Sequence, residues 1–97
     1  MVYRILQLGH SEEACNYKFL PYREDKVAKR SLYNVVYTGV VEHTGGMLDI
    51  LEHLFAKFNI SRPADFKGHS LSVSDVIELD GKCYYCDRIS FVELKNW

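Results

Sequence analysis

The chain has 97 residues, 47% of them hydrophobic and 26% charged. These values match globular proteins, exclude a disordered chain and predict one domain spanning residues 1–97. Twelve basic and thirteen acidic residues give a net charge of -1, which excludes a broad electrostatic attraction to nucleic acid or anionic lipid. We find neither a signal-peptide pattern nor an apolar run near the ~20 residues of a membrane span, and the three cysteines are an odd number. A cytoplasmic protein without disulfides or membrane contact is therefore expected.

Two segments near the N-terminus are rich in strand-forming residues. Residues 3–8 alternate in the strand period and predict an opening strand that Gly9 ends. Residues 16–22 carry large apolar side chains at alternate positions until Pro21, which predicts a short or edge strand. Residues 23–30 are charged and have little apolar periodicity.

The middle of the chain predicts a strand followed by a helix. Residues 32–42 are rich in β-branched and aromatic residues and predict a central strand. One face of this strand is expected to carry Tyr33, Val35, Tyr37 and Val41. Residues 47–58 place apolar side chains at the helical period and predict the main amphipathic helix. Thr44 is placed to cap this helix and Asn59 to end it, and Pro63 prevents its extension.

The C-terminal third predicts a hairpin and a last strand. Two apolar-rich runs, 73–79 and 82–89, flank Asp80 and Gly81, a dipeptide typical of a type I′ turn. Residues 90–94 predict a final strand, with Trp97 at a frayed end or at the edge of the core. The predicted fold is α+β: a curved antiparallel sheet with the helix packed on one face. A partly open barrel is the alternative architecture.

The cysteine pair Cys83 and Cys86 has a spacing known from zinc and redox sites. In a strand, however, residues three apart point to opposite faces with Cα atoms ~10 Å apart. No second such pair completes a metal site, and no two histidines have paired metal-ligand spacing. The four histidines are His10, His43, His53 and His69. We therefore expect no metal or cofactor, and interpret the cysteines as packing residues.

Residues 69–75 contain the elements of a Ser-His-Asp site. His69 is the best single candidate for a functional polar residue, and Asp75 and three serines (Ser70, Ser72 and Ser74) follow it. Members of a catalytic triad usually come together from distant parts of a chain, whereas adjacent serines and aspartates bond backbone amides and fix turns. The structural interpretation is therefore favoured over catalysis, although an enzyme with a site near His69 stays an alternative.

A basic and aromatic segment provides a second candidate surface. Aromatic and basic residues are interleaved in this segment, as they are in proteins that bind single-stranded nucleic acid, although Glu24 and Asp25 reduce its positive charge. The candidate nucleic-acid patch consists of Tyr17, Lys18, Arg23, Lys26, Lys29 and Arg30. A solvated charged loop is the simpler interpretation.

Several sequence words together resemble the YodL-like domain family. The longest and most specific runs from Arg62 to Val76, RPADFKGHSLSVSDV. Shorter ones are YRILQL at 3–8, YKF at 17–19, YNVVYTG at 33–39, KFN at 57–59 and YY at 84–85 followed by Asp87. The resemblance implies a small module found alone or within large proteins of bacterial conjugative elements and phages, with no established reaction. Relatives are expected to carry an aliphatic residue at Cys86.

These observations support three hypotheses about the function. The leading hypothesis is a non-catalytic adaptor module that binds a protein partner, because no active site is assembled while aromatic side chains are abundant. Its candidate interaction surface consists of Arg62, Asp65, Lys67, His69, Ser70, Ser72 and Asp75, next to the hairpin. Nucleic-acid binding by residues 17–30 is the first alternative, and the enzyme near His69 is the second.

Overall fold

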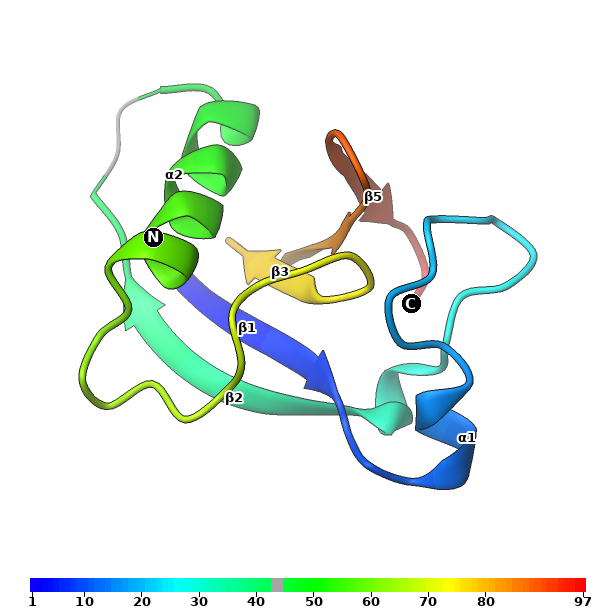
Figure 1. Cartoon of the computed structure of the whole chain (residues 1–97). Helices are drawn as coiled ribbons and strands as arrows, with labels where there is room; N and C mark the ends of the chain where they lie inside the picture. The colour runs from blue at the N-terminus through cyan, green and yellow to red at the C-terminus, as the bar shows by residue number, and fades with distance from the viewer. Residues whose placement is uncertain (43–44) are drawn as a thin grey trace.

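The computed structural model describes residues 1–42 and 45–97. Its elements, in chain order, are β1 (Val2–Leu8), α1 (Glu12–Cys15), the 3-10 turn η1 (Arg30–Leu32), β2 (Tyr33–Val40), α2 (Met47–Ile60), β3 (Val76–Leu79), β4 (Lys82–Cys86) and β5 (Phe91–Leu94). The strands form one antiparallel sheet in the order β2-β1-β3-β4-β5 (Figure 1). The α+β prediction with one main helix is confirmed, and the sheet is open.

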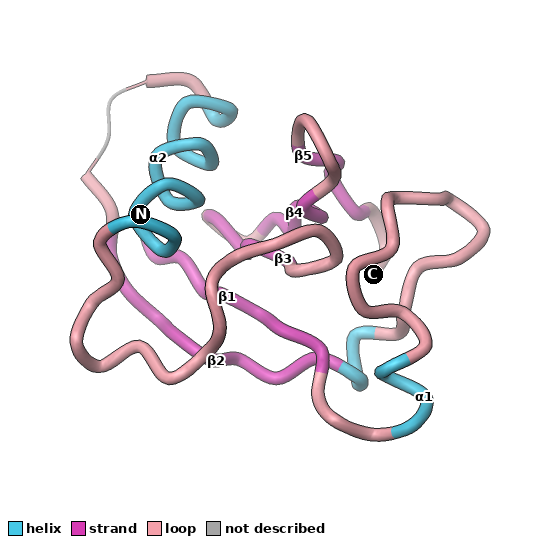
Figure 2. The backbone as a smooth tube through the Cα atoms, in the orientation of Figure 1, coloured by secondary structure: helices cyan, strands magenta, loops and turns pink. Residues whose placement is uncertain are grey.

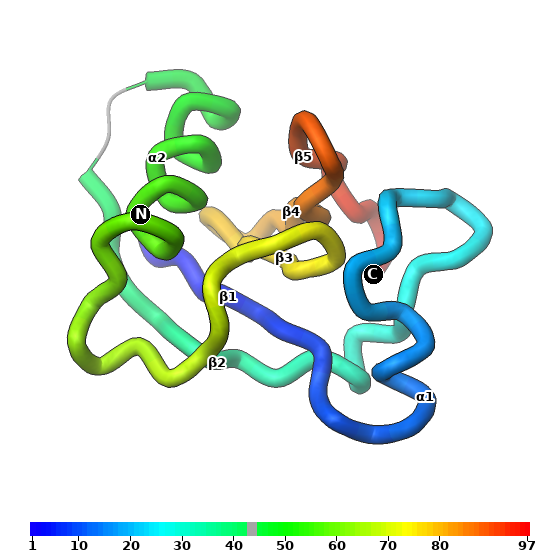
Figure 3. Tube along the Cα trace, in the orientation of Figure 1, coloured from blue at the N-terminus to red at the C-terminus, as the bar shows by residue number. Residues whose placement is uncertain are grey.

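The sheet buries a hydrophobic cluster on each face. On one face, α2 lies against the sheet (Figure 2). Its buried stripe forms a core with alternate residues of β1 and β3. The stripe is Ile50, Leu51, Leu54 and Phe58. On the other face, residues 14–33 cover Leu6 and Leu8, and Trp97 closes this second cluster. The Trp97 indole donates a 2.8 Å hydrogen bond to the carbonyl of Ala28. This bond joins the C-terminal end of the chain, red in Figure 3, to the cyan segment that precedes η1.

The strand β2 differs from its prediction in two respects. It lies at the edge of the sheet, not at its centre, because β1 pairs with both β2 and β3. The predicted single apolar face is also wrong: Tyr33 packs in the cluster opposite α2, whereas Tyr37 packs beside α2. A β-bulge causes the change, since Ile5 pairs with Tyr37 while Leu6 pairs with Val35. One extra residue on β2 reverses the alternation of its side chains.

The strand predicted for residues 16–22 does not form. The chain turns after α1, whose N-terminus is capped by Ser11, and Phe19 adopts a left-handed φ of 64° that strand pairing does not allow. Tertiary bonds hold this segment: the Tyr85 hydroxyl donates to the Leu20 carbonyl at 2.7 Å, and the Tyr22 amide donates to Asp87 Oδ1 at 3.1 Å. Tyr17 and Tyr22 pack against the cluster on the sheet without joining it, whereas Phe19 is 63% exposed.

The main helix is confirmed with small changes at its ends. Asp49 Oδ2 accepts a 3.3 Å hydrogen bond from the Gly46 amide at the N-terminus. Thr44, the predicted cap, and His43 lie outside the described residues. The predicted stop at Asn59 is wrong by one residue, because α2 includes Asn59 and ends at Ile60.

The hairpin and final strand are confirmed, although β4 ends at Cys86, before the predicted residue 89, and β5 begins at Phe91. Asp80 and Gly81 have φ values of 52° and 80°, as a type I′ turn requires. β3 starts at Val76, later than predicted, because Ser74 has a φ of 81° that is incompatible with a strand. Cys83 and Cys86 pack on opposite faces of the sheet and are free thiols, as strand geometry predicts. In the described parts of the chain, no helix is both long and apolar enough to span a membrane.

Candidate functional site

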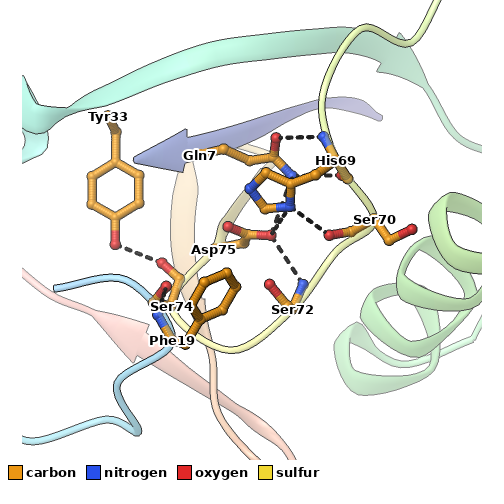
Figure 4. A network of polar contacts seen from close by, with 8 residues as sticks. All are labelled: Gln7, Phe19, Tyr33, His69, Ser70, Ser72, Ser74 and Asp75. Carbon is orange, nitrogen blue, oxygen red and sulfur yellow. Dashed lines mark hydrogen bonds and ion pairs between the residues drawn. The ribbon is translucent and has the colours of Figure 1, made fainter. Parts of the chain in front are cut away.

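Residues 61–75, hereafter the His69 loop, connect α2 to β3 and pass over the end of β1 (Figures 1 and 4). Gln7 fastens this loop. Its Nε2 donates to the His69 carbonyl at 2.8 Å, and its Oε1 accepts from the His69 amide at 3.2 Å. The side-chain amide thus bonds the loop backbone as a strand partner would. Gln7 is only 3% exposed, so these bonds are shielded from water.

Asp75 lies below the loop with its carboxyl group buried. Its Oδ2 accepts hydrogen bonds from the Ser72 amide at 3.0 Å and from Gln7 Nε2 at 3.2 Å. Burial raises the pKa of Asp75 to about 6, although these bonds and the neighbouring His69 act in the opposite direction. The carboxyl group therefore changes charge close to neutral pH while it organises the turn.

Ser74 joins the loop to two other parts of the chain. Its Oγ accepts a 2.9 Å hydrogen bond from the Phe19 amide, and its carbonyl accepts a 2.6 Å bond from the Tyr33 hydroxyl (Figure 4). Burial strongly raises the pKa of Tyr33, so the phenol stays protonated and acts as a donor. These bonds hold the left-handed backbone of Ser74 in place.

His69 is the polar ring that this network presents to solvent. The side chain is 48% exposed, and Nδ1 lies 2.7 Å from the Ser70 carbonyl and 3.9 Å from Asp75 Oδ2. Gln7 Nε2, a donor, also lies 3.3 Å from Nδ1, but it already donates to the His69 carbonyl and to Asp75. The shorter contact to the Ser70 carbonyl, an acceptor, therefore assigns the ring proton to Nδ1. A neutral ring held in this way offers Nε2 as an acceptor, and a protonated ring offers it as a donor.

A cleft of about 260 Å³ lies beside His69. Three separate segments line it: Gln7, Leu8, Gly9 and His10, then Asn34 and Val36, then Lys67, Gly68 and His69. Lys18 adds a further cation at its rim, because Lys18 Nζ lies 3.2 Å from His10 Nδ1. None of the lining residues is an aspartate or glutamate, and Lys67 contributes a positive charge, while the buried Asp75 carboxyl lies 3.9 Å from His69 Nδ1.

The structure divides the predicted interaction surface into an exposed part and a buried part. Arg62, Asp65, Lys67, His69 and Ser70 are exposed, Ser72 is half-buried and Asp75 is buried. The buried part supports the loop from inside. Sequence reasoning missed Gln7, although the signal was present: a polar residue on the same strand face as Tyr3 and Ile5, which are both core residues.

The serines near His69 have structural surroundings. Ser70 uses its carbonyl, Ser72 its amide and Ser74 its hydroxyl, all within the loop network. The Ser72 hydroxyl is buried and has no hydrogen-bond partner among the described residues. Within residues 1–42 and 45–97, no group of three or more His, Cys, Asp or Glu side chains could hold a metal ion.

The candidate nucleic-acid residues have separate roles. Tyr17 packs against the cluster opposite α2, and Lys18 contacts His10. Arg30 donates to Glu78 at 3.2 Å and lies 5.3 Å from the centre of the Trp97 ring, so it is part of the fold. Lys26 and Lys29 are exposed.

The fold and site define a small α+β domain with a fastened loop over an open sheet. The profile of the YodL-like domain matches residues 2–97, essentially the whole chain, so this protein belongs to the YodL-like domain family. No curated protein and no solved structure matches the chain.

Proposed function

We propose that this domain is a non-catalytic adaptor that binds a protein partner through the His69 loop and the cleft beside it. One observation carries the proposal: a buried network fixes the loop while its cationic side chains stay at the surface. A loop held before binding loses little conformational entropy when a partner docks. The Ser74 hydroxyl is buried and bonded to the Phe19 amide, which supports a structural role over a catalytic one for this serine.

The chemistry of the surface favours an acidic segment of the partner. Lys67 and His69 line the cleft together with His10, and no carboxylate lines it. A glutamate or aspartate side chain fits this cleft by charge, with Asn34 as a further hydrogen-bond donor. The resemblance noted in the sequence supports a bacterial, cytoplasmic setting and a role in mobile-element biology as part of the same proposal.

Affinity capture with matched variants tests the adaptor function. The tagged domain is used as bait in cells that carry its parent genetic element, and bound proteins are identified by mass spectrometry. We expect one partner that is lost with Lys67→Glu combined with His69→Ala. Lys95→Glu, which reverses an exposed charge directly after the edge strand β5, is the control and keeps the partner. Equal capture by both variants would overturn the assignment of this surface.

Nucleic acid is the competing ligand, and the exposed Lys26 and Lys29 favour it. Labelled single- and double-stranded DNA is titrated at low and moderate salt, with Lys26→Ala combined with Lys29→Ala as the variant. Arg30 is left intact because its ion pair with Glu78 belongs to the fold. Salt-dependent binding that this variant abolishes would replace the adaptor proposal.

A further inference from the structure

The two edges of the sheet are built differently. The β5 edge is four residues long, contains Glu93 and is followed by Lys95, features that discourage pairing with another strand. The β2 edge is eight residues long and contains no charged residue. A long, uncharged edge strand is a template for a further strand unless something covers it.

The hydrogen-bond pattern shows which backbone groups of β2 face outward. Met1 and Val41 form a paired position, since the Val41 amide donates to the Met1 carbonyl at 2.9 Å and the Met1 amine donates to the Val41 carbonyl at 3.0 Å. Antiparallel pairs alternate, so Gly39 also bonds β1, while Val40 and Thr38 direct their N–H and C=O groups away from it. No strand or loop of the described chain pairs with this outer edge.

Exposed valines lie beside this edge, on the face opposite α2. Residues 14–33 cover only the half of that face that holds Leu6 and Leu8. The other half leaves Val2 48% and Val40 68% exposed, and Val35, the cross-strand partner of Leu6, is 53% exposed. Val2 and Val40 are cross-strand partners, so their side chains lie together.

We propose that a second copy of this chain occupies the edge, with the two β2 strands antiparallel about a two-fold axis. The pairing gives the outward groups of Thr38 and Val40 their backbone partners and brings the valines of both copies together. Charge permits self-pairing, because β2 has no charge to repel its copy. Arg4, the cross-strand partner of Thr38, forms an ion pair with Glu78 at 2.7 Å.

Sedimentation and light scattering with three variants test this dimer. The wild-type chain is expected to have the mass of a dimer, and Val40→Lys and Thr38→Pro the mass of a monomer with an unchanged far-ultraviolet spectrum. Proline at position 38 removes only an outward donor, so the β1–β2 ladder is kept. Ile89→Lys is the control, since Ile89 is 97% exposed and lies between β4 and β5, away from the β2 edge. A wild-type monomer up to about 1 mM, or equal dissociation by Ile89→Lys, would overturn the proposal.

Amide hydrogen exchange gives a second readout. The Thr38 and Val40 amides are expected to gain protection as the protein concentration rises, whereas the Gly39 amide, bonded to β1, is protected throughout. Protection of the two outer amides that appears only when a captured partner protein is added would show that the edge accepts a foreign strand, and would overturn self-pairing. Lys67 and His69 lie in the His69 loop and not in β2, so Lys67→Glu with His69→Ala should remain dimeric.

Discussion

The side chain of Gln7 bonds both backbone groups of His69, at 2.8 Å through Nε2 and at 3.2 Å through Oε1. This relationship places a surface loop by means of a buried residue 62 positions earlier. Gln7 Nε2 also donates to Asp75 Oδ2 at 3.2 Å. The side-chain amide of Gln7 therefore connects β1 with both His69 and Asp75 in the loop that precedes β3.

Gln7→Ala should lower the free energy of unfolding by about 2–3 kcal/mol, because it leaves buried partners of the amide without hydrogen bonds. Urea denaturation measures the change. Asn34→Ala, the exposed cross-strand neighbour of Gln7, is the matched control and should stay within about 0.5 kcal/mol of the wild type. Equal effects of the two substitutions would mean that the Gln7 bonds do not stabilise the loop.

The raised pKa of Asp75 predicts a pH dependence of stability. Its pKa is 3.8 when unfolded and about 6 when folded, so between these values the folded chain binds more protons than the unfolded chain. The contribution is therefore fully present below pH 3.8 and is lost as the pH rises through about 6, a decrease on the order of 3 kcal/mol. Urea denaturation across this range measures the slope.

Asp75→Asn should remove this part of the slope because the residue no longer titrates. Asp80→Asn is the control: Asp80 is exposed in the hairpin turn, where asparagine is also accepted. A slope that survives in Asp75→Asn would assign the titration to another group.

Alanine substitution of two serines in the same turn, Ser74 and Ser72, should affect stability differently. Ser74→Ala removes the acceptor of the Phe19 amide and should cost about 1 kcal/mol of stability. Ser72→Ala removes a buried hydroxyl that has no partner among the described residues, so stability should be unchanged or higher. Thermal melts of the two variants side by side measure the difference, and a destabilising Ser72→Ala would reveal a bonded hydroxyl.

The thiols should differ in reactivity. Cys15 is exposed and should react rapidly with a thiol reagent in the native state, whereas Cys86 is 0% exposed and burial raises its pKa, so it should react only after unfolding. Cys15→Ser should abolish the rapid phase. Bound zinc in the purified protein, or rapid modification of Cys86, would contradict the packing role of the cysteine pair.

Local signals predicted the elements whose conformation depends on neighbouring residues. The helical period of residues 47–58 and the turn dipeptide Asp80-Gly81 each specify a conformation within a few residues. The predicted strand at 16–22 had a similar apolar alternation, yet hydrogen bonds to Tyr85 and Asp87 hold it as a loop. Alternation alone does not distinguish a strand from a loop that packs on a sheet.

The sequence indicated the main residues of the candidate site but not the hydrogen bonds that position them. His69 and Asp75 stood out by residue type, and turn chemistry explained the serines before their bonds were known. The bond from Gln7 to His69 could not be inferred, because it crosses 62 residues and depends on the exact register of β1.

The sequence by itself determined the α+β class, the main helix, the hairpin and the separation of the two cysteines, because periodicity, turn chemistry and strand geometry act locally. Only the tertiary structure decided that β2 is an edge strand with a bulge, that Gln7 fastens the His69 loop, and that the cationic cleft forms. Strand order, register and buried hydrogen bonds depend on contacts between distant residues, which no local pattern specifies.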